Sequence, residues 1–218
     1  MIEQVTLRDG TDAFAVPLER TDRAALVAEF ETLSPESQRR RFLAPVRHLS
    51  DAMLDHLVDD VDGVHHIALV LCVETSPDVY DPVALARMVQ YADVTDAADL
   101  AVTVKDAWQG RGVATVLLEV LMHRRPAGVD RIVTEVLQDN PASLRMLRRL
   151  GAVSLEDEGN GVYGVVVELE PLAAAGAPVA TQSPVPEGRG KGRPPPLLHD
   201  PRHRHELHTR DQLCPWFR

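Results

Sequence analysis

The segment 109–115 contains two glycines at a spacing that suits a loop which binds an anion. An apolar, β-branched run at 100–104 precedes it, and an amphipathic run at 115–125 follows it. A glycine loop between a strand and a helix presents unpaired backbone N–H groups and the positive end of the helix dipole to a ligand. Because glycine has no Cβ, the main chain can approach a phosphate closely. The segment therefore predicts a site for a phosphorylated cofactor.

The spacing of the loop excludes two common phosphate motifs. A P-loop needs a Lys after its last glycine, and none follows Gly112. A dinucleotide fingerprint needs a third glycine where this chain has Thr115. The pattern Gln109-x-x-Gly112-x-Ala114 instead resembles the pyrophosphate loop of the GNAT N-acetyltransferase superfamily. This resemblance implies that the loop binds acetyl-CoA.

A second stretch, after the β-rich run 130–137, strengthens the resemblance. Asn140, Ser143 and Gly151 fall at positions that GNAT proteins use after their fifth strand. Leu147 stands where the family has a Tyr, and Ala152 stands where it has a Phe. Asn140 also suits the N-cap of a helix, and Gly151 suits a helix end. The segments 33–42 and 49–57 are further similar to bacterial GNAT proteins related to protein lysine acetyltransferases.

The resemblance implies a set of cofactor contacts. The pantetheine arm would pair with the exposed edge of the strand that ends at Val104, because a strand edge is a template for amide pairing. The pyrophosphate would lie on the amides of 110–115. Arg111 would either add charge near a phosphate or be a solvated surface side chain, and Asn140 would either cap its helix or contact the thioester. The expected cofactor contacts are Val102, Val104, Gln109, Gly110, Arg111, Gly112, Val113, Ala114, Thr115, Asn140 and Ser143.

Direct acetyl transfer to an amine requires a base, because an ammonium with a pKa of about 10.4 must lose a proton before it attacks. Many GNAT relatives have a Glu at the start of the fourth strand, where this chain has the shorter Asp99. Asp99 would act through a water molecule, or it is a solvated residue at the strand entry. Glu135, on the fifth strand, is the other candidate base. Leu147 cannot protonate the thiolate as the family Tyr does.

Two functions are consistent with the resemblance to GNAT proteins. The first is an N-acetyltransferase that moves an acetyl group from acetyl-CoA to a primary amine, either a protein lysine or a small molecule. The alternative is a non-catalytic acyl-CoA-binding regulatory module, with Asp99 and Leu147 as signs of a degenerate site.

Composition limits the partners and the compartment. The chain of 218 residues has a formal net charge of −10, which argues against nucleic acid as a partner. Its two cysteines make no disulfide framework, and no signal peptide or long apolar run is present. We therefore expect a cytoplasmic bacterial protein without a membrane partner. No metal site is expected, because the His-rich segment 203–208 lacks the His-Glu-x-x-His spacing.

The order of elements predicts an α/β (α+β) fold. The resemblance implies a mixed, mostly antiparallel sheet with helices on both faces, splayed between its fourth and fifth main strands. The expected strands are 4–7, 13–18, 66–73, 83–92, 100–104, 130–137 and 162–169, with helices from 21, 35, 51, 115 and 141. We expect residues 1–172 to form the domain that resembles GNAT proteins, and 173–218, rich in Pro, Gly, Arg and His, to form a disordered tail. Apolar alternation in 162–169 fits either the core or the edge of a homodimer.

Overall fold

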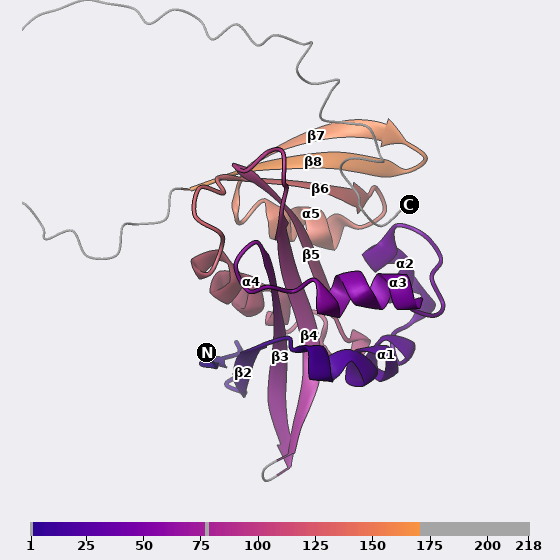
Figure 1. The fold of residues 1–218 in the computed structure, drawn as a ribbon, viewed down its shortest axis with the longest axis vertical. Helices are drawn as coiled ribbons and strands as arrows, with labels where there is room; N and C mark the ends of the chain where they lie inside the picture. Colours follow the sequence, from indigo (N-terminus) through magenta and orange to yellow (C-terminus); the bar gives the residue numbers. More distant parts are fainter. Residues whose placement is uncertain (1, 77–78, 171–218) are drawn as a thin grey trace, which may run out of the picture. The chain divides into compact units, whose positions relative to one another are not determined.

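The computed structural model describes residues 2–76 and 79–170, and its centre is a sheet of eight strands (Figure 1). The spatial order is β1-β2-β3-β4-β5-β6-β8-β7. Neighbouring strands are antiparallel except for β5 and β6, which are parallel. The strands are β1 (Glu3–Thr6), β2 (Asp12–Pro17), β3 (His66–Ser76), β4 (Val79–Gln90), β5 (Ala97–Val104), β6 (Arg131–Leu137), β7 (Gly151–Gly159) and β8 (Val162–Leu169). The predicted mixed, mostly antiparallel sheet is confirmed.

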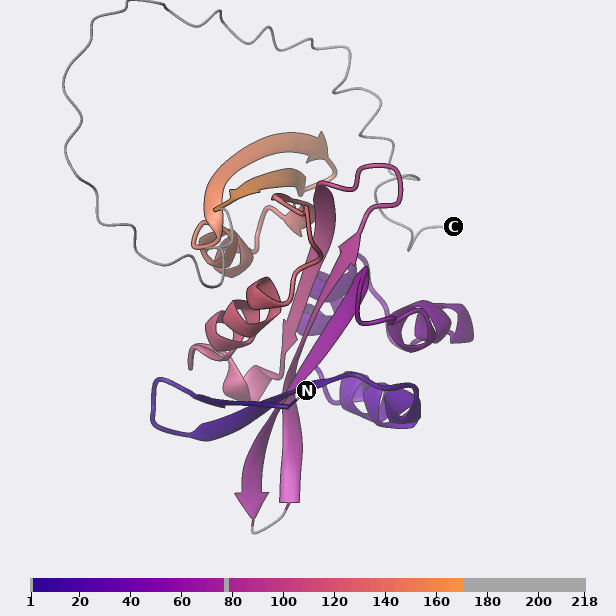
Figure 2. The same ribbon diagram turned by 60° about the vertical axis from the view of Figure 1, so that its left-hand side comes forward.

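Helices cover both faces of this sheet, as predicted (Figures 1 and 2). They are α1 (Arg23–Glu31), α2 (Pro35–Phe42), α3 (Asp51–Leu54), α4 (Val113–His123) and α5 (Pro141–Leu147), with the 3-10 turns η1 (Arg20–Asp22) and η3 (Asp106–Trp108) and the π-helical turn η2 (Asp55–Asp59). Helices α4 and α5 bury apolar side chains against one face, and α1, α2 and η2 pack on the other. In α4 the buried residues recur at helical spacing, which is why this segment folds as an amphipathic helix: Val113, Leu117, Leu118, Val120 and Leu121.

The sheet forks between β5 and β6. The two strands pair only at Ala97–Arg131 and Ala98–Ile132, near their N-terminal ends, and then separate. Two side chains bond carbonyl groups near the fork: the Tyr91 hydroxyl donates to Val133 O at 2.9 Å, and the Thr134 hydroxyl donates to Leu100 O at 3.2 Å. Buried carbonyl groups need such partners, so these bonds stabilise the open geometry. The predicted splay is confirmed.

Several element boundaries differ from the sequence prediction. Strand β7 was not predicted. Most of its side chains are exposed, so it lacks the apolar alternation that marks a strand. It is an edge strand that pairs with β8 through a turn in which Asn160 has a φ of 53° and Gly161 a φ of 78°. Strand β5 also begins three residues earlier than expected, at Ala97.

The tail 173–218, including its His-rich segment, lies outside the described residues, so the domain boundary at 172 stays a prediction. In the described part of the chain, no helix combines the length and the apolar composition that a membrane span needs.

Candidate active site

The glycine loop lies between η3 and α4. Gly110 has a φ of 76° and Gly112 a φ of 85°, left-handed values that glycine adopts at low cost. Gly112 is the N-cap of α4, and no side chain caps this end of the helix. The first-turn N–H groups of an α-helix have no acceptor within the helix, so those of Val113, Ala114 and Thr115 are available to an anion.

The Gln109 side chain holds the loop against neighbouring elements. Its Nε2 donates to Val104 O at 3.2 Å and to the Ser37 hydroxyl at 3.1 Å. These bonds join the end of β5, the loop and α2. Gln109 therefore positions the backbone of the loop through its amide group.

Arg111 has a protein partner beside the loop. Its Nε donates to the Asp9 carboxylate at 2.9 Å, and its guanidinium lies 3.9 Å from the centroid of the Trp108 ring. Hydrogen bonds from Thr11 and Arg111 lower the pKa of Asp9 to about 2. The positive charge of Arg111 is thus at the loop, but it is shared with the turn between β1 and β2.

Beyond the fork, β5 presents an edge on which an extended ligand could pair. Val102 and Val104 pair with Ala86 and Ala84 of β4 on one side. On the other side, the ladder with β6 ends at Ala98, so no described strand pairs with this part of β5. The edge leads directly from the fork to the glycine loop.

Asn140 and Ser143 bond to each other at the start of α5. The Asn140 Oδ1 accepts from the Ser143 backbone N–H at 3.2 Å, and its Nδ2 donates to the Ser143 hydroxyl at 2.8 Å. Asn140 is 7% exposed and is the N-cap of the helix, as its sequence context predicted. An Asn amide has two donors and two lone pairs, so these bonds leave capacity for one more contact of each kind.

Asp99 lies inside β5, paired with Val89, and not at the strand entry. Its side chain is partly buried. Burial raises the pKa of this carboxyl group, against the opposing effects of a hydrogen bond from Thr134 and the positive charges of Arg41 and Arg87. Asp99 is therefore not the solvated residue at the strand entry that the sequence allowed.

Sequence reasoning missed Arg87 as part of this environment. Arg87 pairs with Ala101 of β5, on the same face as Asp99, and is only 2% exposed. Its guanidinium donates to His66 Nε2 and to the carbonyls of His56 (3.2 Å) and Leu57 (3.3 Å). A charged residue within the apolar run of β4 was the available signal.

The other sequence candidates lie around the fork. Glu135 is in β6, paired with Gly164 of β8, beyond the point at which β5 and β6 separate. Leu147 is 2% exposed and packs in the hydrophobic core, so no hydroxyl group occupies the position of the family Tyr. In the described residues, no group of three or more His, Cys, Asp and Glu side chains could hold a metal ion.

A sheet that forks between two parallel strands, next to an uncapped helix N-terminus, is the arrangement that the resemblance to GNAT proteins led us to expect. The chain belongs to the GNAT acetyltransferase family, because the model of the acetyltransferase (GNAT) domain matches residues 15–153. GNAT domains bind acyl-CoA, and the family carries out acyl transfer.

Two relatives are named acetyltransferases. Acetyltransferase Pat of Mycolicibacterium smegmatis is 34% identical over 140 residues, 64% of this chain and 40% of that protein. Acetyltransferase PA5475 of Pseudomonas aeruginosa is 30% identical over 141 residues, 62% of this chain and 74% of that protein. The aligned part of this chain thus spans two fifths of the length of Pat.

Solved structures share the fold. The GNAT domain of S. lividans PAT is 30% identical, with a TM-score of 0.65 over 77% of this chain and 97% of that chain. RimL, a ribosomal L7/L12 α-N-protein acetyltransferase solved in complex with coenzyme A, is 17% identical, with a TM-score of 0.57 over 77% and 98%. The second likeness concerns the fold alone.

Proposed function

We propose that this protein is an N-acetyltransferase that moves the acetyl group of acetyl-CoA directly to a primary amine. The observation that carries the proposal is the uncapped N-terminus of α4 behind Gly110 and Gly112, continuous with the open edge of β5. The diphosphate of acetyl-CoA binds the N–H groups of 113–115, where the helix dipole also stabilises its charge. The pantetheine amides pair with Val102 and Val104, which brings the thioester to the fork.

The reaction at the fork has one bond made and one broken. The neutral amine attacks the thioester carbonyl, the tetrahedral oxyanion collapses, and the C–S bond breaks to release CoA thiolate. The proton of the attacking amine passes to Asp99 through water, because the short side chain lies within a strand. Water protonates the thiolate, since buried Leu147 offers no acid.

Partial burial of Asp99 supports its role as the base. A pKa above the usual value for Asp makes the carboxylate a stronger proton acceptor than a solvated one. Glu135 is the second candidate, on the opposite strand of the fork.

A regulatory module that binds acyl-CoA without catalysis is the alternative, and the core position of Leu147 favours it. The two functions separate in one experiment. The full chain is incubated with acetyl-CoA and a panel of primary amines that includes a lysine peptide, and free thiol release is followed. Amine-dependent thiol release supports the transferase, whereas acetyl-CoA binding by calorimetry without thiol release supports the module.

A further inference from the structure

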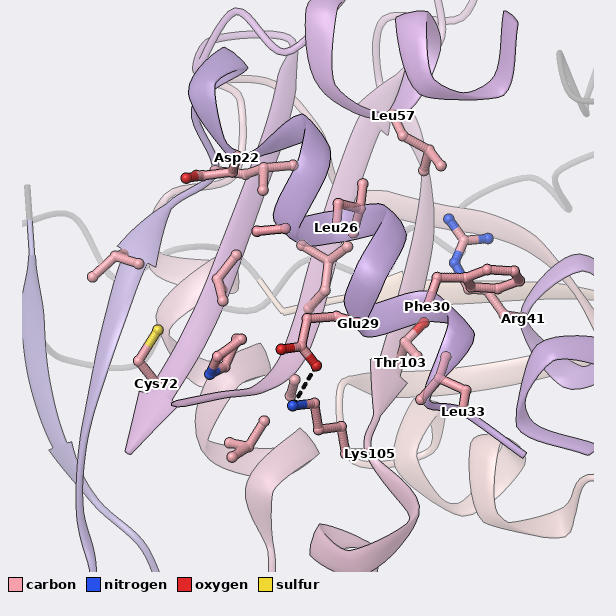
Figure 3. A pocket seen from close by; sticks show the side chains of 18 of the residues that line it. Asp22, Leu26, Glu29, Phe30, Leu33, Arg41, Leu57, Cys72, Thr103 and Lys105 are labelled. Carbon is pink, nitrogen blue, oxygen red and sulfur yellow. Dashed lines mark ion pairs between the residues drawn. The ribbon is translucent and has the colours of Figure 1, made fainter. Parts of the chain in front are cut away.

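A cavity of about 230 Å³ lies between α1 and the face of the sheet formed by β2 to β5 (Figure 3). Its walls are mostly apolar and include Leu26, Phe30, Leu33, Phe42, Val70 and Leu85. A dry apolar cavity of about 150 Å³ holds a benzene ring. This cavity therefore has room for a ring or a branched chain together with a short linker. Cavities of this kind, with few polar groups, are the usual form of small-molecule sites.

The cavity and the open edge belong to the same strand. Thr103 lines the cavity and lies between Val102 and Val104, the residues whose backbone faces the fork. Figure 3 shows the Thr103 side chain among the cavity residues, near Leu33 and Lys105. A thioester arm on the β5 edge would consequently run along one wall of the cavity.

Two acidic and two basic side chains line the cavity. Glu29 of α1 forms an ion pair with Lys105, and Figure 3 shows this pair next to the apolar side chains. Their side chains are 33% and 27% exposed, so the pair borders on solvent. Asp22 and Arg41 also line the cavity. The ligand that fits is uncharged where it meets the apolar wall.

An apolar cavity also favours the reactive form of an amine. Removal from water disfavours an ammonium and lowers its pKa, which increases the share of neutral amine. Only the neutral amine has the lone pair that attacks a thioester. Partial removal of the acceptor nitrogen from water would therefore assist the proton loss that direct transfer requires.

We propose that this cavity is the acceptor subsite and that it receives a small primary amine with an apolar ring or branched chain. This inference rests on the proposed N-acetyltransferase function. The amine extends from Thr103 towards the fork, where it meets the thioester. There the C–N bond forms, the C–S bond breaks and CoA departs as the thiolate. Asp99 lies four residues from Thr103 along β5, about 13 Å, so the amine proton reaches it through a chain of water molecules.

Two neighbouring alanines of α1 provide a matched test. Ala25 lines the cavity, whereas Ala24 does not, and both are exposed, so a Trp at either position is compatible with folding. Ala25→Trp and Ala24→Trp are compared with the unchanged chain, using 2-phenylethylamine, ethanolamine and a lysine peptide as acceptors. Thermal unfolding confirms that both variants are folded, and calorimetry measures their affinity for acetyl-CoA.

The inference predicts that 2-phenylethylamine has a kcat/KM about tenfold or more above that of ethanolamine, a typical gain from an apolar pocket. Ala25→Trp should raise the KM for 2-phenylethylamine by about tenfold at unchanged acetyl-CoA affinity, and Ala24→Trp should not. An unchanged KM in Ala25→Trp, or a preference for the lysine peptide or for ethanolamine, would overturn the inference and leave the transferase function intact. Absence of thiol release with every acceptor would overturn both.

Discussion

The carboxylate of Asp106 accepts hydrogen bonds from both the backbone N–H of Ser34, at 2.9 Å, and the Ser34 hydroxyl, at 2.8 Å. The Ser37 hydroxyl adds a third bond at 2.7 Å. Ser34 is the N-cap of α2, and Asp106 lies in the connection that leads from β5 to the glycine loop. The Asp106 carboxylate thus joins α2, whose Phe42 lines the proposed acceptor cavity, to the segment that leads to the glycine loop.

Asp106→Asn removes this carboxylate and tests whether its hydrogen bonds to Ser34 and Ser37 stabilise the fold. Burial alone would raise the pKa of Asp106, but the hydrogen bonds from Ser34 and Ser37 hold it below its usual value. A depressed pKa means that the carboxylate stabilises the fold at neutral pH and that this contribution is lost as the pH falls through the folded-state pKa. We expect Asp106→Asn to lower the free energy of unfolding at pH 7 by about 1 kcal/mol, since solvent screens the site. Urea unfolding measures the loss, and Asp93→Asn, in the turn between β4 and β5, is the control. Equal stability of the two variants would contradict this role.

Asp99→Asn tests the proposed base. Because the pKa of Asp99 is raised in the folded chain, this group contributes to stability at acid pH, and that contribution is lost as the pH rises through the folded-state pKa. At neutral pH the ionised carboxylate therefore lowers the free energy of unfolding. The Asn variant should therefore be at least as stable as the unchanged chain at pH 7. Its kcat should nevertheless fall by about a hundredfold, as expected for loss of a general base.

Asp99→Glu, which restores a carboxylate, is the matched control and should retain turnover. The acid limb of the kcat/KM profile should disappear in Asp99→Asn alone. An Asn variant with the pH profile of the unchanged chain would remove Asp99 from the mechanism and would direct attention to Glu135.

The lowered pKa of His66 predicts how the free energy of unfolding depends on pH. Burial, followed by the positive charge of Arg87, lowers the pKa of His66 to about 4, and Arg87 donates to its Nε2, which must therefore be unprotonated. Because the unfolded chain binds this proton near pH 6.5, stability should fall as the pH drops from 6.5 towards 4, by up to about 3 kcal/mol. His66→Gln keeps a hydrogen-bond acceptor without this titration. Unfolding by urea at several pH values should give a flatter curve for the variant, and parallel curves would refute the assignment.

The sequence predicted those parts of the fold that local chemistry determines. Asn140 was predicted as a helix N-cap, and helices were predicted to begin after Ser34 and Ser50; the side chain of each of the three accepts from the backbone N–H three residues later. The predicted order of strand, glycine loop and helix is also present, with the strand at 97–104 and the helix at 113–123, because apolar periodicity and two left-handed glycines mark it. Local signals were sufficient for these elements.

The remaining features depend on contacts between distant segments. Edge strand β7 is mostly exposed and pairs on one side only, so it has little apolar pattern. The burial of Asp99 and Arg87 arises from α2 and η2, which are far away in sequence. The cavity under α1 likewise forms only when four strands and this helix pack together. Of these features only Arg87, a charged residue within the apolar run of β4, leaves a signal within one segment.

Isothermal titration of coenzyme A tests most directly whether the backbone at Gly112 binds the diphosphate. The unchanged chain should bind coenzyme A. Gly112→Glu should weaken binding by about a hundredfold or more, because a Cβ there meets the Arg8 side chain at 3.0 Å and the variant adds a negative charge at the N-terminus of α4. Gly128→Glu is the control for backbone strain and added charge: Gly128 has a φ of 87°, close to the 85° of Gly112, but it lies in the connection between α4 and β6, where a Cβ meets no other atom within 4 Å. The account predicts near-normal affinity for Gly128→Glu. Equal affinities for Gly112→Glu and the unchanged chain, or no binding by the unchanged chain, would contradict it.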